Sequence, residues 1–534
     1  MAGIFAGYDR VIIDASFFLI SDAVPDLLED FRESSLWVAG TFREEVMSYK
    51  QLLNGERKSA FVEFSERLIQ ETQIHVLNFQ DRDAPMDTWE MIREFSARKS
   101  ERRFAVATGN RLLIEKIILS DAPTIDADIF DLSSNRWILC GDFPYLRDSV
   151  EFHTEEVQEI PQWKNEDIRD ETNLFRRDGS IVTLRKPNDN QKGGGAESVM
   201  FWAFDSDSDE KRMAKIFKPG RLSGEKCLHL QRMIEACKNI DAPWVLFPTD
   251  ILSQDQHGSR PVGILERYAD NCSPLYNRDM YRGKALSSLS PKELQTKLSD
   301  TLRLCLNIVR QVSFLNHYGF FISDYNLRNF ALSEKDPEHA LMFDSDSFGY
   351  GNFFGNIFAG NSTLRHYHTE RKLEAFDFCD DALYVAIFSL LSLGDAPIFH
   401  DHQRNTRTFR YDNRKYKFFY RKYLFPPRLW AVFESAFHEK TVFSVPMLLW
   451  TLSESLKELE RNPARDFTYQ DRLGELAEEA DDPLPPRLPD RKGPKEKGIW
   501  KRLLSGKYDR ILLAFAGIAA AGLVVLFLLY GFSQ

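Results

Sequence analysis

Hydrophobic and polar positions follow two different patterns along this chain of 534 residues. In the first 150 residues, short apolar runs such as "RVIIDAS" (10–16) and "RRFAVATGN" (102–110) predict buried strands that end in polar loops. Segments 88–100 and 112–120 have the spacing of amphipathic helices. Strands that alternate with helices predict a parallel sheet, and therefore an α/β domain over residues 1–150.

The pattern changes after a charged, weakly periodic connector at residues 151–180. Strand-like runs come first, among them "SVMFWAF" (198–204) and "RMAKIF" (212–217). Long helical patterns follow, such as 294–319. Residues 181–462 are therefore expected to form a second domain of α+β class.

The end of the chain has a third character. Residues 463–510 are rich in proline and charge, which predicts a linker. Residues 511–532 contain no charged side chain, follow a basic segment, and are long enough to cross a bilayer. The sequence predicts a C-terminal transmembrane helix, a tail-anchored membrane protein and soluble domains facing the cytoplasm; the alternative is a buried core helix.

Composition narrows the classes of partner. The net charge is −11, so bulk electrostatics does not support binding to RNA or another nucleic acid. Six cysteines without a CxxC pair are typical of free thiols in a reducing compartment rather than of a zinc site.

Candidate chemistry is concentrated in an ordered set of residues within the second domain. A glycine cluster precedes a strand, a lysine stands within an apolar strand about twenty residues later, and "SDYNLRN" and "FDSDSF" each follow an apolar run. Phosphoryl transfer needs a backbone cover for phosphates, a lysine, a group that positions the hydroxyl, and oxygen ligands for magnesium. The residues that could supply these parts are Gly193, Gly194, Gly195, Lys215, Asp324, Asn329 and Asp344.

These motifs resemble those of the bacterial YegI-type protein kinases, and the resemblance covers about residues 181–460. It implies a bilobal kinase-like fold that uses ATP and Mg²⁺ and phosphorylates a serine or threonine of a protein substrate. It further implies that the three glycines and Lys215 bind the phosphates, that Asp324 orients the acceptor hydroxyl, and that Asn329 and Asp344 bind magnesium. "GILERYAD" resembles the hinge that holds adenine, which makes Glu266 a nucleotide-binding candidate. Asp381 matches the helix aspartate that braces the catalytic loop.

Some positions depart from the kinase pattern. Ile322-Ser323 replaces the usual His-Arg before the catalytic aspartate, and no APE motif is evident. The glutamate that should pair with Lys215 is not obvious; Glu225 and Glu235 are candidates. A pseudokinase that binds nucleotide, or binds nothing and serves as a scaffold, is the alternative.

Acidic residues also recur in the first domain, where parallel strands bring their carboxyl ends to one edge. Asp14 ends a strand, Glu45 lies in a helical segment, and Asp87 opens another helix. This spacing resembles a PIN domain, a three-layer α/β nuclease fold, and implies a Mg²⁺ or Mn²⁺ site for RNA cleavage. The fourth position of the motif is Asn110, a neutral residue that weakens the expected site. Helix N-caps in a non-catalytic domain are the other interpretation of these acids.

Two further functions therefore stand beside the membrane-anchored kinase that the sequence favours. One is a PIN-type, metal-dependent ribonuclease regulated by a pseudokinase. The other is a catalytically inactive membrane scaffold.

Overall fold

The structure is a computed structural model in which residues 1–469 form one compact unit and residues 470–534 a second. The described residues are 3–19, 35–71, 74–78, 85–98, 104–120, 125–150, 168–186, 197–205, 208–275, 291–322, 324–334, 339–351, 372–391, 398–401, 406–409, 426–434 and 444–461. All of them belong to the first unit, so the predicted linker at 463–510 lies outside the described residues.

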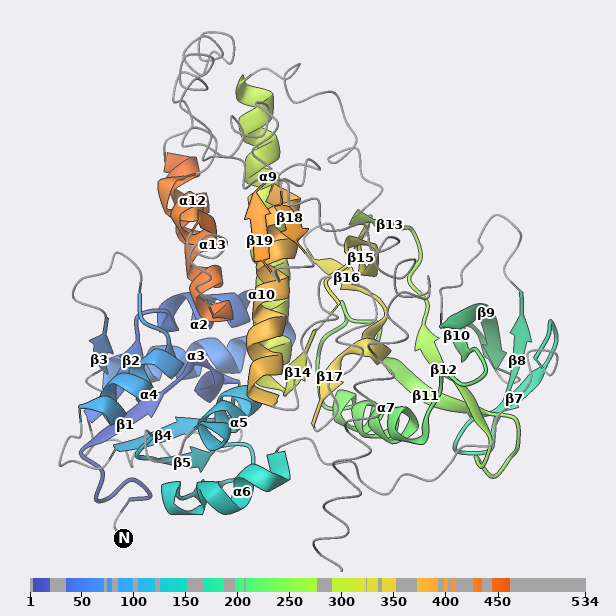
Figure 1. The fold of residues 1–534 in the computed structure, drawn as a ribbon, viewed down its shortest axis with the longest axis horizontal. Helices are drawn as coiled ribbons and strands as arrows, with labels where there is room; N and C mark the ends of the chain where they lie inside the picture. Colours follow the sequence, from blue (N-terminus) through green and yellow to red (C-terminus); the bar gives the residue numbers. More distant parts are fainter. Residues whose placement is uncertain are drawn as a thin grey trace, which may run out of the picture. The chain divides into compact units, whose positions relative to one another are not determined.

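A mainly parallel sheet forms the N-terminal region, as the alternation of strands and helices predicts (Figure 1). Its order is β3-β2-β1-β4-β5-β6, and only the last pair is antiparallel. The strands are β1 (Arg10–Ile13), β2 (Ser35–Ala39), β3 (Ile74–Leu77), β4 (Phe104–Thr108), β5 (Ala127–Asp131) and β6 (Arg136–Ile138). Strands β4 and β5 are buried at every position, which explains the apolar sequence of β4, whereas β5 also buries Asp128 and Asp131.

Helices connect these strands. They are η1 (Ala15–Phe18), α2 (Phe42–Leu52), α3 (Gly55–Glu71), α4 (Thr88–Ala97), α5 (Arg111–Leu119), η4 (Cys140–Asp142) and α6 (Phe143–Val150). Asp87 caps α4 through a reciprocal capping box with Glu90, and Asn110 caps α5 by accepting from the Leu113 amide. The two helices therefore begin where polar side chains satisfy their first amides.

A closed barrel begins the second region, in the order β10-β12-β11-β7-β8-β9. Its strands are β7 (Asn173–Phe175), β8 (Ile181–Arg185), β9 (Ser198–Asp205), β10 (Ser208–Phe217), β11 (Pro248–Ser253) and β12 (Pro261–Arg267). Helix α7 (Gly224–Cys237) packs on β11, beside which Figure 1 shows it. Strand-like runs near 180–217 thus become one barrel rather than an open sheet.

Helices dominate the rest of this region. They are α9 (Pro291–His317), α10 (Lys372–Leu391), α12 (Pro427–Glu434) and α13 (Val445–Arg461), with the short turns η8 (Leu327–Asn329) and η9 (Ser345–Ser347). Small antiparallel pairings join β13 (Cys272–Pro274), β15 (Phe330–Ser333) and β16 (Ala340–Met342), then β14 (Phe320–Phe321) with β17 (Gly349–Tyr350), and β18 (Ile398–Asp401) with β19 (Thr406–Phe409).

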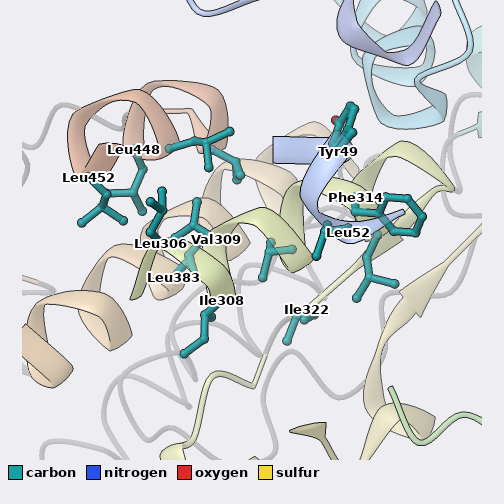
Figure 2. Packing of buried hydrophobic residues seen from close by; sticks show 14 of the residues in the cluster. Tyr49, Leu52, Leu306, Ile308, Val309, Phe314, Ile322, Leu383, Leu448 and Leu452 are labelled. Atoms are coloured by element: carbon teal, nitrogen blue, oxygen red, sulfur yellow. The ribbon is translucent and has the colours of Figure 1, made fainter. Parts of the chain in front are cut away.

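The N-terminal and kinase-like regions share a hydrophobic core. Tyr49 and Leu52 of α2 belong to the same buried cluster as Phe314 of α9, and Figure 2 shows the three side chains close together. Tyr49 Oη also lies 3.2 Å from Ser313 Oγ. Helix α2 therefore buries its apolar face against the second region, which fixes the two regions to each other within this unit.

The expected C-terminal transmembrane helix requires correction. Nowhere in the described ranges is there a helix both long enough and apolar enough to cross a membrane. The two longest helices, α9 and α10, carry several charged residues that a bilayer core would exclude. Residues 511–532 lie outside the described residues. By the finding above, the predicted membrane-spanning segment, membrane partner and tail-anchored location are withdrawn.

Candidate functional site

Lys215 lies at the centre of the kinase-like site. It stands on β10 opposite Met200 of β9 and Ile264 of β12, and only 7% of it is exposed. Its Nζ donates to carboxylate oxygens of Asp344 and Asp346. A buried ammonium needs such partners, because burying it alone would be very costly. The structure thus joins the lysine and the metal-loop aspartate, which are 129 residues apart in the sequence.

A second buried lysine, which sequence reasoning missed, completes this cluster. Lys226, in the first turn of α7, is 5% exposed, and its Nζ lies 3.3 Å from Asp346 Oδ2 and 3.6 Å from Glu197 Oε2. A signal was available, since Lys226 shares one helical face with the apolar residues Leu230 and Met233 at i+4 and i+7. A charged residue on an apolar stripe indicates a buried, paired side chain.

The two glutamates expected to partner Lys215 do not do so in the described chain. Glu235 lies exposed and pairs with Lys238 at 2.6 Å. Glu225 is in the first turn of α7, next to Lys226. The carboxylates that contact Lys215 are those of Asp344 and Asp346. Asp346 supplies the counter-charge because it reaches both lysines from the loop that follows β16.

Electrostatics in this cluster favours charged groups despite their burial. Burial opposes ionisation of Asp346, but the charges and hydrogen bonds of Lys215 and Lys226 outweigh it and lower its pKa to about 2. Burial likewise opposes the charge on Lys215, yet Asp346, Asp344 and Glu266 together raise the pKa of its ammonium. The site therefore holds an ionised carboxylate between two ammonium groups at neutral pH.

Asp324 and Asn329 lie together, as the motif "SDYNLRN" predicts. Asn329 Nδ2 donates to Asp324 Oδ2 at 3.3 Å, and the Asn326 amide donates to Asp324 Oδ1 at 3.2 Å. Asn329 O accepts from the Phe343 amide at 2.8 Å, which links this loop to the residue before Asp344. Burial and the neighbouring charge of Asp344 raise the pKa of Asp324 above its ordinary value.

Asp344 adopts a left-handed backbone conformation, with φ 58° and ψ 33°. This conformation is uncommon for residues other than glycine and often marks a functional turn. The side chain of Asp344 is 41% exposed although its carboxylate contacts Lys215. Burial and the charge of Asp346 raise its pKa, against the pull of Lys215.

Glu266 of β12 lies on the same sheet face as Lys215. It stands opposite Met213, two residues from Lys215 along β10, and side chains two apart share a face. Its Oε1 is buried and has no hydrogen-bond partner in the described part of the chain. Burial raises the pKa of Glu266 to about 8, although Lys215 acts in the opposite direction.

Other predicted residues of this site are not described. Gly193, Gly194 and Gly195 lie outside the described residues. Asp381 belongs to α10, but its side chain is likewise not described. The predicted phosphate cover and the predicted brace of the catalytic loop remain predictions.

The oxygen donors of Asp344 and Asn329 suit magnesium. Mg²⁺ is usually held by one or two carboxylates together with phosphate oxygens and water. Asp344 and Asn329 offer a partly exposed carboxylate and an amide oxygen on connected loops. These two residues fit the metal that the resemblance implies.

The N-terminal acids form a different kind of site. Asp14, Glu45, Asp87 and Asn110 line one cavity of about 90 Å³, as the meeting of strand ends predicts. Ile322 and Tyr325, which flank Asp324, line the same cavity from the kinase-like region. A space of this size holds a few water molecules.

The cavity acids have local partners and raised pKa values. Asp14 accepts from Ser16 Oγ, Glu45 accepts from Thr41 Oγ1 at 2.7 Å, and Asp87 caps α4. Burial raises the pKa of Asp14 to about 6, and burial together with the charges of Asp14 and Asp87 raises that of Glu45 to about 8. Across the described residues, no group of three or more His, Cys, Asp or Glu side chains is arranged to hold a metal ion. The Mg²⁺ or Mn²⁺ site that the resemblance to a PIN domain implies at these acids stays a prediction.

Comparisons with known proteins give similarities of structure alone. No protein-family model and no curated protein sequence matches the chain. Among solved structures, the kinase domain of a Toxoplasma gondii rhoptry antigen matches at 13% identity and a TM-score of 0.37, covering 56% of this chain and 89% of that one. The BubR1 kinase domain matches at 13% identity and a TM-score of 0.35, covering 62% and 89%. Both structures are protein kinase domains. The chemistry of the present site rests on the contacts of its own residues.

Proposed function

We propose that the kinase-like region binds ATP with Mg²⁺ and transfers the γ-phosphoryl group to a serine or threonine hydroxyl of a protein. The single observation that carries this proposal is the joining of Lys215 with Asp344 next to the hydrogen-bonded pair Asp324 and Asn329. Phosphoryl transfer depends mainly on positioning and on charge stabilisation, and these residues supply both.

Each side chain has a role that follows from its surroundings. Lys215 would bind phosphate oxygens, with Asp346 keeping its ammonium charged and fixed from behind. Asn329 and Asp344 would hold the metal, which supplies neutralisation of phosphate charge when bound. Glu266 lies beside Lys215 with a free buried oxygen and is the candidate for contact with the base.

Asp324 would accept the proton of the acceptor hydroxyl. As the new O–P bond forms and the bond from the γ-phosphorus to the bridging oxygen breaks, this proton passes to the Asp324 carboxylate and then to solvent. The raised pKa of Asp324 makes its carboxylate a better base than an exposed aspartate.

Label transfer from γ-labelled ATP by the full-length chain, with magnesium and a generic acceptor protein, tests this function. Asp324→Asn should lower the rate about 100-fold or more while magnesium-dependent ATP binding persists, because it removes only the base. Asp344→Ala should lose both transfer and magnesium-dependent ATP binding. Asp300→Asn, an exposed aspartate of α9, is the matched control and should act as wild type.

Two results would contradict the proposal. One is equal label transfer by wild type and Asp344→Ala, which would assign the activity to a contaminant. The other is absence of transfer by wild type; if magnesium-dependent ATP binding persisted, it would leave a pseudokinase.

A further inference from the structure

A second cavity, larger than the acidic one, lies where the N-terminal region meets the kinase-like region. It has a volume of about 660 Å³, within the usual range of small-molecule sites. Its polar and aromatic lining includes Arg57, Arg111, Glu115, His317, Tyr318 and Tyr350. None of the residues assigned to phosphoryl transfer above lines it, so it is distinct from the nucleotide site.

His317 provides a buried polar group without a partner. It ends α9, is 3% exposed, and its Nδ1 has no hydrogen-bond partner among the described residues. Burial lowers its pKa to about 3, so the ring is neutral at physiological pH. Less than 1 Å² of this nitrogen is accessible, so an occupant of the cavity contacts other atoms of the His317 ring, which lines the wall.

The charges on the cavity wall favour an anion. Arg111 Nε lies 3.3 Å from Glu115 Oε1, but half of the Arg111 side chain remains exposed. Arg57 contributes another exposed guanidinium. The named lining groups thus carry one positive charge in excess, in the form of the fork that binds carboxylate and phosphate best.

Aromatic side chains form further parts of the wall. The ring of Tyr350 stacks on Phe320 with centroids 4.5 Å apart, and Tyr318 packs on Phe314 at 5.1 Å. Arg57 pulls down the pKa of Tyr318, which burial raises, and Arg111 does the same for Tyr350. Each tyrosine therefore has a guanidinium in its vicinity, so an aromatic face and a cation occur together twice.

From these features we infer that this cavity binds a small molecule with a flat ring and one carboxylate or phosphate group. The ring packs against the tyrosines and the His317 side chain, and the anion meets Arg111 and Arg57. The cavity also touches Gly319 and Tyr350, next to the paired strands β14 and β17. Strand β14 comes shortly before Asp324 in the chain, and β17 comes shortly after Asp344. An occupant of the cavity therefore contacts strands that flank the proposed catalytic residues.

Calorimetric titration of the full-length chain tests this site, with chelator present so that metal-dependent nucleotide binding is suppressed. The probes are adenosine 5′-monophosphate and indole-3-acetate, which separate a phosphate source from a carboxylate source. One of them should bind wild type with 1:1 stoichiometry. Arg111→Gln should weaken that binding about tenfold or more, because it removes a charged hydrogen bond. His317→Phe should weaken it as well, because the larger ring narrows the cavity.

Controls separate this site from the proposed kinase site and from misfolding. Arg136→Gln changes an exposed arginine of β6 outside the cavity and should bind as wild type. Asp344→Ala should also bind the probe normally, whatever its phosphotransferase activity. His317→Phe keeps a ring against Tyr49, and its thermal melting checks its fold.

The inference is overturned if neither probe binds wild type at millimolar concentration. It is also overturned if Arg111→Gln and His317→Phe bind as tightly as wild type, or if Asp344→Ala abolishes binding. None of these results depends on whether label is transferred from ATP, so the two proposals fail separately.

Discussion

The kinase-like site around Lys215 and the N-terminal acidic cavity both contain buried carboxylates, but the pKa values of Asp346 and Glu45 shift in opposite directions. At the site around Lys215, Asp346 is 1% exposed and its pKa falls to about 2. In the cavity, Glu45 is 5% exposed and its pKa rises to about 8. The buried lysines Lys215 and Lys226 account for the difference, because they lower the pKa of Asp346, whereas no cation among the described residues offsets the rise in the pKa of Glu45 that burial causes.

This difference shows how one residue type serves two purposes. The Asp346 carboxylate, paired with two buried lysines, stays ionised, so its negative charge is held in place beside Lys215. Glu45, buried without such a cation, keeps its proton at neutral pH, and Asp87 caps α4. The cavity acids thus support the contact between the two regions, where Ile322 and Tyr325 form the opposite wall.

The largest effect is expected from removing Asp346, the counter-charge of the two buried lysines. Asp346→Ala should lower the free energy of unfolding by about 3–5 kcal/mol, because it leaves Lys215 and Lys226 buried without their shared carboxylate. Chemical denaturation of the full-length chain measures this. Asp300→Ala, at an exposed pair, should stay within about 0.5 kcal/mol of wild type. A loss below about 1 kcal/mol for Asp346→Ala would mean that the lysines are not held by this residue.

An intermediate effect is expected from pH. Glu45 of the cavity and Glu266 beside Lys215 both contribute to it, because burial raises both pKa values to about 8, and Glu45→Gln isolates the share of the cavity. The folded chain keeps the proton of Glu45 up to pH about 8, whereas the unfolded chain releases it near 4.5. Stability from this group is thus complete below pH 4.5 and is lost as pH rises toward 8. Between about pH 6 and pH 9 wild type should lose about 2–3 kcal/mol that Glu45→Gln retains.

Denaturation at several pH values tests this sign, with Glu56→Gln as an exposed control that keeps the wild-type dependence. Asp346 adds no slope in this window, since its lowered pKa contributes stability that is lost only below pH 3.8. Stability of wild type that rises from pH 6 to pH 9 would show that Glu45 is ionised, and would remove the contrast between the two sites.

The smallest effect is expected at a salt bridge between the regions. Lys457 of α13 lies 2.6 Å from Glu44 Oε1 of α2, but 41% of its side chain is exposed. Lys457→Met should therefore cost less than about 1 kcal/mol, because exposed ion pairs are largely offset by solvation. A cost as large as that of Asp346→Ala would mean that burial does not govern the value of these pairs.

The sequence by itself determined the parts of the site that lie close together along the chain. Asp324 and Asn329 are five residues apart, so the loop between them brings their side chains together through local hydrogen bonds. Asp87 and Asn110 likewise begin α4 and α5 because capping is a local interaction. The apolar runs of β1 and β4 identified a parallel sheet, since full burial demands continuous hydrophobicity.

Tertiary structure decided what depends on distant partners. Asp346, rather than either expected glutamate, pairs with Lys215, and Lys226, 120 residues before Asp346, shares the same carboxylate. The closure of the acidic cavity required α9 and α13 to pack on α2, which no local spacing reveals. His317 is the last residue of α9, and only the meeting of two regions buries its Nδ1 without a hydrogen-bond partner among the described residues. Burial and long-range pairing set the charge of these groups, and both are properties of the folded chain.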